Sequence, residues 1–136
     1  MTQDEKFLPE GIPAWQMPFW ESLQQHRAEV QRCDACGTYV FIPKERCPRC
    51  HRSSFTWTPV SGKGEVYTYT VVHRAPSPAY QAEAPYVIAH VTMEEGFRMA
   101  STLRRVEPGG VRIGMPVRLA YDDATPEWTL FVFDPT

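Results

Sequence analysis

Two pairs of closely spaced cysteines constrain the fold of this chain more than any other feature of its sequence. Cys33 and Cys36 form one pair, Cys47 and Cys50 form the other, and the whole pattern is C-x2-C-x10-C-x2-C. Each pair can point two thiolates at a common tetrahedral centre, which favours zinc over the rubredoxin-type iron that uses similar spacing. Four thiolates leave no open coordination position, so the sequence predicts a structural zinc and not a catalytic one.

The second pair also allows a different interpretation, because Cys47 to His51 read C-x-x-C-H, the pattern of covalent haem attachment. We reject it, since haem attachment requires export and leaves Cys33 and Cys36 without a role. Residues 1–6 are polar and lack the apolar segment of a signal peptide, and no run approaches the roughly 18 apolar residues of a membrane span. We therefore expect a cytoplasmic protein that does not enter membranes.

Charge is distributed unevenly along the chain, whose formal net charge is −2. Residues 1–30 carry −3, residues 31–60 carry +3 and residues 61–136 carry −2. Four thiolates around a divalent zinc add −2 to the middle segment, which leaves it only slightly basic. A protein that binds a nucleic-acid backbone normally has a larger basic excess, so we expect no nucleic-acid partner.

Hydrophobic periodicity predicts a mainly β chain with one short helix near its start. The proline-rich residues 1–18 favour an extended arm, and apolar residues recur at helical spacing between Phe19 and Val30. A brief strand is expected within residues 37–43, between the cysteine pairs. Alternation of period two then predicts five strands, at residues 65–73, 86–93, 97–103, 117–121 and 128–133.

Turns separate these five strands, so a small barrel is expected. Tyr67, Tyr69 and Val71 should share one face of the first barrel strand. The expected domains are an N-terminal arm and helix (1–30), a zinc ribbon (31–60) and the barrel (61–136). Their boundary falls at Ser61–Gly64, which reads as a hinge.

Several short motifs resemble those of a known family, the acyl-CoA-associated zinc-ribbon/OB-fold proteins that were long filed as a domain of unknown function. They are Phe19-Trp20, Cys33–Gly37, Phe41–Pro43, Cys47–Cys50, Ser61–Tyr67, Pro85–Val87 and Ile113–Val117. The similarity extends over nearly the whole chain. It implies an N-terminal helix, a rubredoxin-like zinc ribbon and a five-stranded OB-fold barrel. Residues 103–114 are too few for the helix that many OB-folds insert there.

The resemblance also implies a function. Members are partner subunits of thiolases or lipid-transfer-type aldolases, to which they contribute CoA binding and complex stability, while the catalytic cysteine and histidine reside on the thiolase-fold partner. The length of 136 residues is similar to that of short members, such as the small subunit of a benzoylsuccinyl-CoA thiolase. We therefore expect a non-catalytic subunit of a hetero-oligomer. Aromatic, steroid side-chain and acetoacetyl substrates all remain open.

Basic side chains are the candidates for contact with CoA, whose phosphates call for arginine or lysine donors. These candidates are Arg49, Arg52, Lys63, His73, Arg74, Arg98 and Arg104, with Arg46 and Arg105 beside them. Solvated surface charge is the alternative for each of them. The candidates for partner docking are the aromatic residues Trp15, Phe19 and Trp20, which could instead pack on the chain's own barrel.

The sequence lacks the common catalytic motifs: it has no nucleophile elbow, phosphate-binding loop, H-E-x-x-H or dinucleotide fingerprint. Two rival functions nevertheless remain. A single-stranded nucleic-acid binder could stack bases on Tyr67, Tyr69 and Phe97. A free-standing acyl-CoA enzyme could pair His90 with Glu83 or Glu94.

Overall fold

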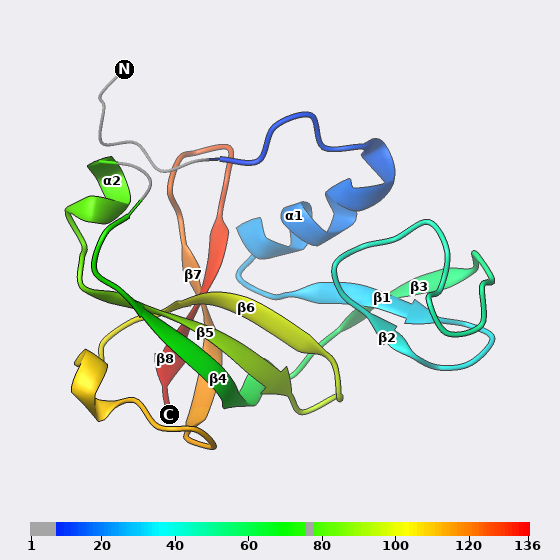
Figure 1. Ribbon diagram of the computed structural model, residues 1–136. Coiled ribbons are helices and arrows are strands. Elements are labelled where there is room, and N and C mark those ends of the chain that lie inside the picture. Colours follow the sequence, from blue (N-terminus) through cyan, green and yellow to red (C-terminus); the bar gives the residue numbers. More distant parts are fainter. Residues whose placement is uncertain (1–7, 76–77) are drawn as a thin grey trace.

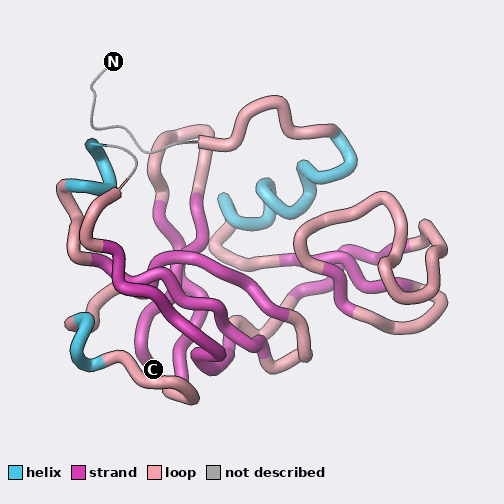
Figure 2. Tube along the Cα trace, in the orientation of Figure 1, coloured by secondary structure: helices cyan, strands magenta, loops and turns pink. Residues whose placement is uncertain are grey.

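A three-stranded sheet and a closed five-stranded barrel form the β structure of the computed structural model, which describes residues 8–75 and 78–136 (Figure 1). Residues 1–7 of the expected N-terminal arm lie outside the described residues. The helices are short and lie beside the strands (Figure 2), so the expected mainly β fold is confirmed. Within the described ranges, no helix has the length and apolar character needed to cross a membrane.

The first elements, η1 (Ala14–Gln16) and α1 (Met17–Gln24), lead into the sheet, which has the order β2-β1-β3. Its strands are antiparallel, and Glu29 pairs with Pro59 while Cys33 pairs with Phe55. The strand bounds are β1 (Glu29–Cys33), β2 (Tyr39–Val40) and β3 (Phe55–Pro59).

The expected helix over residues 19–30 is too long. α1 begins with Pro18 in its first turn and ends at Gln24, and His26 then takes a left-handed conformation with φ 55°. Val30 is buried, but it belongs to β1 and pairs with Thr58. Phe19 and Leu23 on α1 and Val30 on β1 are buried in the same core, so their apolar spacing imitates one longer helix.

The barrel closes in the order β4-β5-β6-β8-β7, and β4 pairs with β7 to complete it. Its strands are β4 (Lys63–Val72), β5 (Tyr86–Met93), β6 (Arg98–Leu103), β7 (Pro116–Asp122) and β8 (Leu130–Pro135). The short helix α2 (Pro78–Gln81) precedes β5, and the turn η2 (Pro108–Gly110) stands between β6 and β7. The expected five-stranded barrel is confirmed, and among the described residues the connection between β6 and β7 carries only the three-residue 3-10 helix η2.

Alternation along β5 follows the expectation, because Val87, Ala89, Val91 and Met93 all point into the barrel core. β4 does not alternate as expected. A bulge between Val66 and Thr68 buries Val66 and leaves Tyr67 52% exposed, while Tyr69 is half-buried against the core. Tyr67 and Tyr69 therefore do not share the face that period two predicts.

Helix α1 spans the space between barrel and ribbon (Figure 1). Its residue Phe19 is only 1% exposed, and its ring meets those of Phe41, from the ribbon, and Phe131, from β8, edge to face. Phe19 is thus a core residue in this chain, which agrees with the alternative that it packs on the chain's own barrel. The aromatic cluster ties together the three parts of the chain.

Candidate metal centre and groove

The four cysteine sulfurs converge at one point of the ribbon, and all their Sγ atoms lie within 4.8 Å of one another. Two of the separations are 3.5 Å (Cys33 to Cys50) and 3.7 Å (Cys36 to Cys47). Tetrahedral zinc with Zn–S bonds of about 2.3 Å requires sulfurs about 3.8 Å apart. The cysteines therefore fit a zinc ion in a closed four-thiolate shell, whose chemistry is structural.

Two matched turns carry the cysteines. In each turn an amide hydrogen bonds back to the first cysteine: Gly37 N–H donates to Cys33 O at 2.8 Å, and His51 N–H donates to Cys47 O at 2.9 Å. Gly37 and His51 both have positive φ, at 75° and 67°. This shared geometry turns the backbone around the metal, and it explains why residues with left-handed conformations follow each C-x-x-C pair.

The thiols could not all ionise at this spacing without a cation. The hydroxyl and the backbone of Thr38 lower the pKa of Cys36 to about 6. The backbone of Arg52 has the same effect on Cys50, but burial and the sulfurs of the other cysteines outweigh it and raise the pKa of Cys50 to about 11. A divalent metal removes this conflict, because it binds the deprotonated form of every thiol.

Polar side chains brace the ribbon around the metal centre. Asp34 accepts hydrogen bonds from Ser54 at 2.7 Å and Thr56 at 2.6 Å, and these two bonds, that from Thr56 foremost, lower the pKa of the Asp34 carboxyl. Gln31 is buried and bonds both backbone groups of Lys44, at 2.7 and 2.8 Å. The two bonds from Gln31 hold the loop after β2 in place, which matters because that loop forms one wall of a groove.

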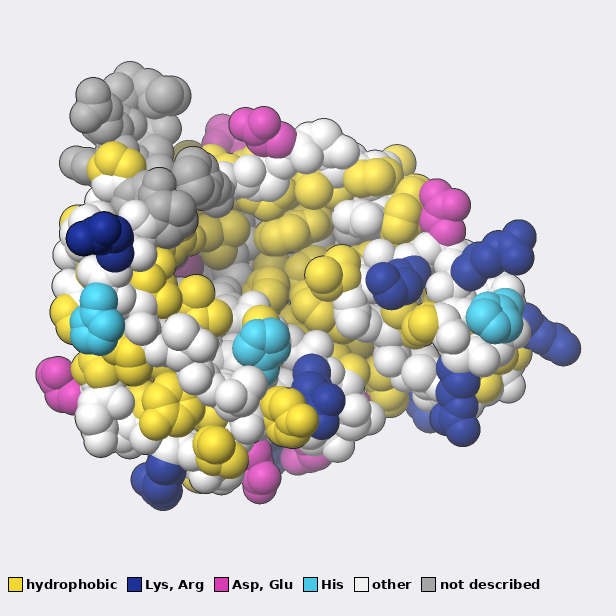
Figure 3. Space-filling view, viewed as in Figure 1, with side chains coloured by type: hydrophobic (Ala, Val, Ile, Leu, Met, Phe, Trp, Pro, Cys, Tyr) yellow, Lys and Arg dark blue, Asp and Glu magenta, His cyan; other side chains and the backbone are white. Residues whose placement is uncertain are grey.

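A groove of about 450 Å³ lies between α1, the loop after β2 and the outer face of β5 and β6. We call it the helix–ribbon groove. Its floor is aromatic, built by Phe19, Trp20, Phe41 and Phe131. Its border carries Ile42, Lys44, His90 and Arg98. Figure 3 shows hydrophobic side chains gathered in this hollow, with basic side chains and a histidine beside it.

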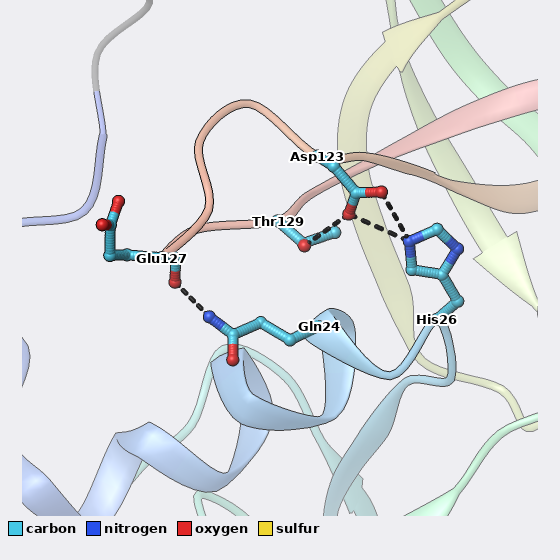
Figure 4. Close-up of polar contacts among 5 residues, drawn as sticks. All are labelled: Gln24, His26, Asp123, Glu127 and Thr129. Carbon is cyan, nitrogen blue, oxygen red and sulfur yellow. Dashed lines mark hydrogen bonds and ion pairs between the residues drawn. The ribbon is translucent and has the colours of Figure 1, made fainter.

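A polar clamp holds the end of α1 against the loop between β7 and β8 (Figure 4). His26 Nε2 lies 2.9 and 3.0 Å from the two carboxylate oxygens of Asp123, and the Thr129 hydroxyl donates to the same carboxylate at 2.7 Å. The imidazole also stacks on Tyr121, with ring centres 4.9 Å apart. In the same contact, the Gln24 amide donates to the backbone carbonyl of Glu127. The clamp therefore fixes the helix that forms one side of the groove.

The residues expected to contact CoA do not converge on one site. Lys63 begins β4 and His73 follows its last residue, so they lie roughly 33 Å apart along an extended strand. Arg104 is bound by Asp134 in an ion pair, and Arg98 borders the helix–ribbon groove. The groove residues Lys44 and His90 were not among the candidates, because they come from distant segments and carry no shared motif.

Like His73 and Arg74, which follow β4, Arg49 and Arg52 are CoA candidates close to each other in sequence. They flank Cys50 at the outer end of the ribbon, and both are exposed. Figure 3 shows several Lys and Arg side chains gathered over the ribbon. Of the docking candidates other than Phe19, Trp15 is 37% exposed and Trp20 is half-buried, with its ring against Trp128 at 5.8 Å.

The barrel, the ribbon and the four-cysteine centre together define a zinc-ribbon/OB-fold protein. Two protein-family models match consecutive segments: "ChsH2, rubredoxin-like zinc ribbon domain" over residues 20–56 and "ChsH2, C-terminal OB-fold domain" over residues 57–122. A "DUF35 domain-containing scaffold protein" of Methanocaldococcus jannaschii is 45% identical over 104 residues, which are 75% of this chain and 73% of that protein. The chain belongs to this DUF35 family, with zinc-ribbon and OB-fold domains of the ChsH2 type.

Two further relatives extend the comparison. A "Probable enoyl-CoA hydratase alpha subunit" of Thermomonospora curvata is 45% identical over 120 residues, 86% of this chain. The chain spans only about a third of that protein, 36% of its length. The solved structure "Ltp2-ChsH2(DUF35) aldolase" contains a chain with a TM-score of 0.84 and 38% identity, over 93% of this chain and 98% of that one.

Proposed function

We propose that this chain is a non-catalytic subunit of a complex in which a thiolase-fold partner makes or cleaves carbon–carbon bonds in acyl-CoA substrates. The observation that carries the proposal is the similarity to the chain in the "Ltp2-ChsH2(DUF35) aldolase" structure, which covers nearly all of both chains. The name "scaffold protein" of the M. jannaschii relative supports the same role. The chain would stabilise the partner and complete its surface, while the partner performs the chemistry.

The site chemistry agrees with a non-catalytic role. The cysteine centre offers a metal no open position for water or substrate. His90 and Glu94 are one of the two pairs considered for a free-standing enzyme. His90 lies in β5 and Glu94 follows its last residue, Met93, so the strand between them already spans about 10 Å. That distance is too long for a proton relay. His26 and Asp123 do form a pair, but neither of them borders the helix–ribbon groove.

The rival function, binding of single-stranded nucleic acid, lacks a row of exposed aromatic rings on which bases could stack. Phe97 is buried in the barrel, and the bulge in β4 separates Tyr67 from Tyr69. Tyr67 remains exposed, but the guanidinium of Arg98 lies over its ring at 3.8 Å and occupies one face. Successive bases need several exposed rings in a row, so this surface suits them poorly.

For CoA itself, we propose contact at the outer end of the ribbon through Arg49 and Arg52. Arg52 is fixed to the metal turn, because its backbone carbonyl accepts from Cys47 N–H at 2.8 Å. Both residues are exposed, and neither takes part in an ion pair among the described residues, so both could donate to phosphate oxygens. Their positions allow them to complete a CoA site whose remainder lies on the partner.

Co-expression tests the proposed subunit role. This chain would carry an affinity tag and be produced together with the thiolase-fold protein encoded nearest to it. We expect the two chains to co-purify in a fixed ratio and to elute together in size-exclusion chromatography. Elution of the tagged chain alone, with its zinc in place, would contradict the proposal.

A further inference from the structure

The helix–ribbon groove is basic at its border and has no acidic residue among those that line it. Lys44, His90 and Arg98 stand on three different segments, yet all border the same apolar floor. Lys44 and Arg98 have no ion-pair partner among the described residues, and basic donors beside an aromatic surface favour a negatively charged, partly apolar occupant. A carboxylate or another anion in the groove would therefore meet basic groups and no acidic residue among those that line it.

Among the described residues, only neutral groups hold Arg98 in place. Its guanidinium lies over the ring of Tyr67 at 3.8 Å, and its Nε donates to the Thr92 hydroxyl at 3.3 Å. Both contacts orient the side chain, and neither neutralises its charge. An anion that meets Arg98 thus encounters a donor that has already lost much of its conformational freedom, which favours binding.

Two large apolar side chains, one in the groove lining and one next to a lining residue in sequence, are exposed. Ile42 borders the groove and is 60% exposed, and Trp15, adjacent in sequence to the groove residue Gln16, is 37% exposed. A small ligand enclosed by the groove would leave Trp15 in water, whereas a protein segment laid across it would bury both residues. Large exposed apolar side chains around a pocket are the usual anchors of a protein interface.

We propose that the helix–ribbon groove docks a segment of the thiolase-fold partner that carries apolar side chains next to an aspartate or glutamate. Ile42, Trp15 and the aromatic floor receive the apolar part, and Arg98 with Lys44 receives the carboxylate. This inference rests on the proposed subunit role and adds to it the place of contact and the chemistry of the partner surface.

The test compares groove variants with matched variants elsewhere. Ile42→Asp and Arg98→Glu change the groove border. Ile113→Asp and Arg112→Glu make the same changes at exposed residues outside the groove lining, in the segment between η2 and β7, which Figure 1 shows away from α1. Ile113 is 69% exposed, so it matches Ile42. Zinc content and thermal unfolding of each variant establish that it folds. The dissociation constant for the co-expressed thiolase-fold partner is then measured for all four.

We expect each groove variant to weaken binding at least tenfold and each control to remain within twofold of the unmodified chain. A photo-crosslinking residue in place of Ile42 should label an apolar partner segment that contains an acidic residue. Replacement of that acid by arginine should restore binding to Arg98→Glu. Such restoration would identify the charge pair directly.

Three results would overturn the inference. The first is a complex that forms normally with both groove variants. The second is a crosslink from position 42 to a partner segment without an acidic residue. The third is binding of octanoyl-CoA by the isolated chain that Ile42→Asp abolishes while partner binding persists. If the unmodified chain forms no complex at all, the proposed subunit role fails, and this inference fails with it.

Discussion

Arg104 and Asp134 form a bidentate ion pair at the seam where β6 meets β8. Arg104 Nε donates to one carboxylate oxygen and Nη2 to the other, both at 3.0 Å, and the hydrogen bonds with Asp134 raise the pKa of Arg104. Asp134 is 5% exposed. The described ladder between these parallel strands consists of a single residue pair, Leu103 with Phe133, so the ion pair reinforces the weakest junction of the barrel.

Replacement of Arg104 by alanine should destabilise the barrel, because it leaves the buried Asp134 carboxylate without its partner. We expect a loss of about 2–4 kcal/mol in the free energy of unfolding, since Arg104 itself is partly exposed. Urea unfolding followed by circular dichroism measures this loss. Arg112→Ala, at an exposed residue, is the control and should change stability by less than about 0.5 kcal/mol. Equal effects of the two substitutions would contradict the role of the seam.

Removal of zinc should unfold the ribbon. The purified chain should contain one zinc ion, and a chelator strong enough to extract it should release four reactive thiols together. Cys47→Ser should abolish zinc binding and partner binding, or make the chain insoluble, without a selective kinetic defect in the complex. Metal analysis and thiol titration provide the readouts. A chain that keeps its thermal stability after complete zinc loss would show that the metal is not structural.

The clamp on α1 should respond to pH through Asp123. The hydroxyl of Thr129 and the imidazole of His26 lower the pKa of Asp123 below its ordinary value of 3.8. A lowered carboxyl pKa in the folded state adds stability above the unfolded pKa, and this stability disappears as pH falls through the folded pKa. Asp123→Asn should therefore lower the urea midpoint at pH 5 and differ progressively less from the unmodified chain towards pH 3.

Glu127→Gln is the control for the clamp, because it removes a nearby exposed carboxyl while its backbone carbonyl still accepts from Gln24. It should leave the urea midpoint nearly unchanged at both pH values. A difference between Asp123→Asn and the unmodified chain that stays constant from pH 5 to pH 3 would show that the ionised carboxylate does not hold the helix.

Gly64 allows the barrel strands β4 and β5 to approach one another closely. A Cβ at this position would lie 2.5 Å from Val91 Cγ1 and 2.9 Å from the backbone oxygen of Thr92. Gly64→Ala should cost about 1–3 kcal/mol of stability through this overpacking. A Cβ at Gly109 would meet nothing within 4 Å, so Gly109→Ala is the matched control. Thermal unfolding compares the two, and an equally stable Gly64→Ala variant would contradict the close approach.

Features with a local signal in the sequence could be predicted. The cysteine spacing identifies the metal ribbon, because two knuckles need only short loops to form. The alternation of Val87, Ala89 and Val91 identifies β5, since one of its faces lies wholly in the core. The resemblance to a known family added the OB-fold topology, which periodicity alone does not supply.

Features that depend on distant partners could not be predicted. The strand β3 (Phe55–Pro59) was not predicted. It pairs with β1, and the start of β1 was predicted as helix because apolar residues recur at helical spacing up to Val30. The bulge beside Tyr67 is a property of the pairing of β4 with β5 and leaves no mark in the local pattern. The helix–ribbon groove likewise combines segments far apart in sequence, such as those of Trp20 and Arg98, so no spacing rule could assemble it.

Turnover by the complex and by its separated subunits tests most directly whether this chain is a non-catalytic partner. Acetoacetyl-CoA, benzoylsuccinyl-CoA and a steroid side-chain 3-hydroxyacyl-CoA would be offered to the complex, to the thiolase-fold partner and to this chain, each with full zinc content. We predict carbon–carbon bond cleavage of one substrate class by the complex, reduced or no activity of the partner by itself, and none by this chain. Cleavage by the isolated chain would contradict the proposed role.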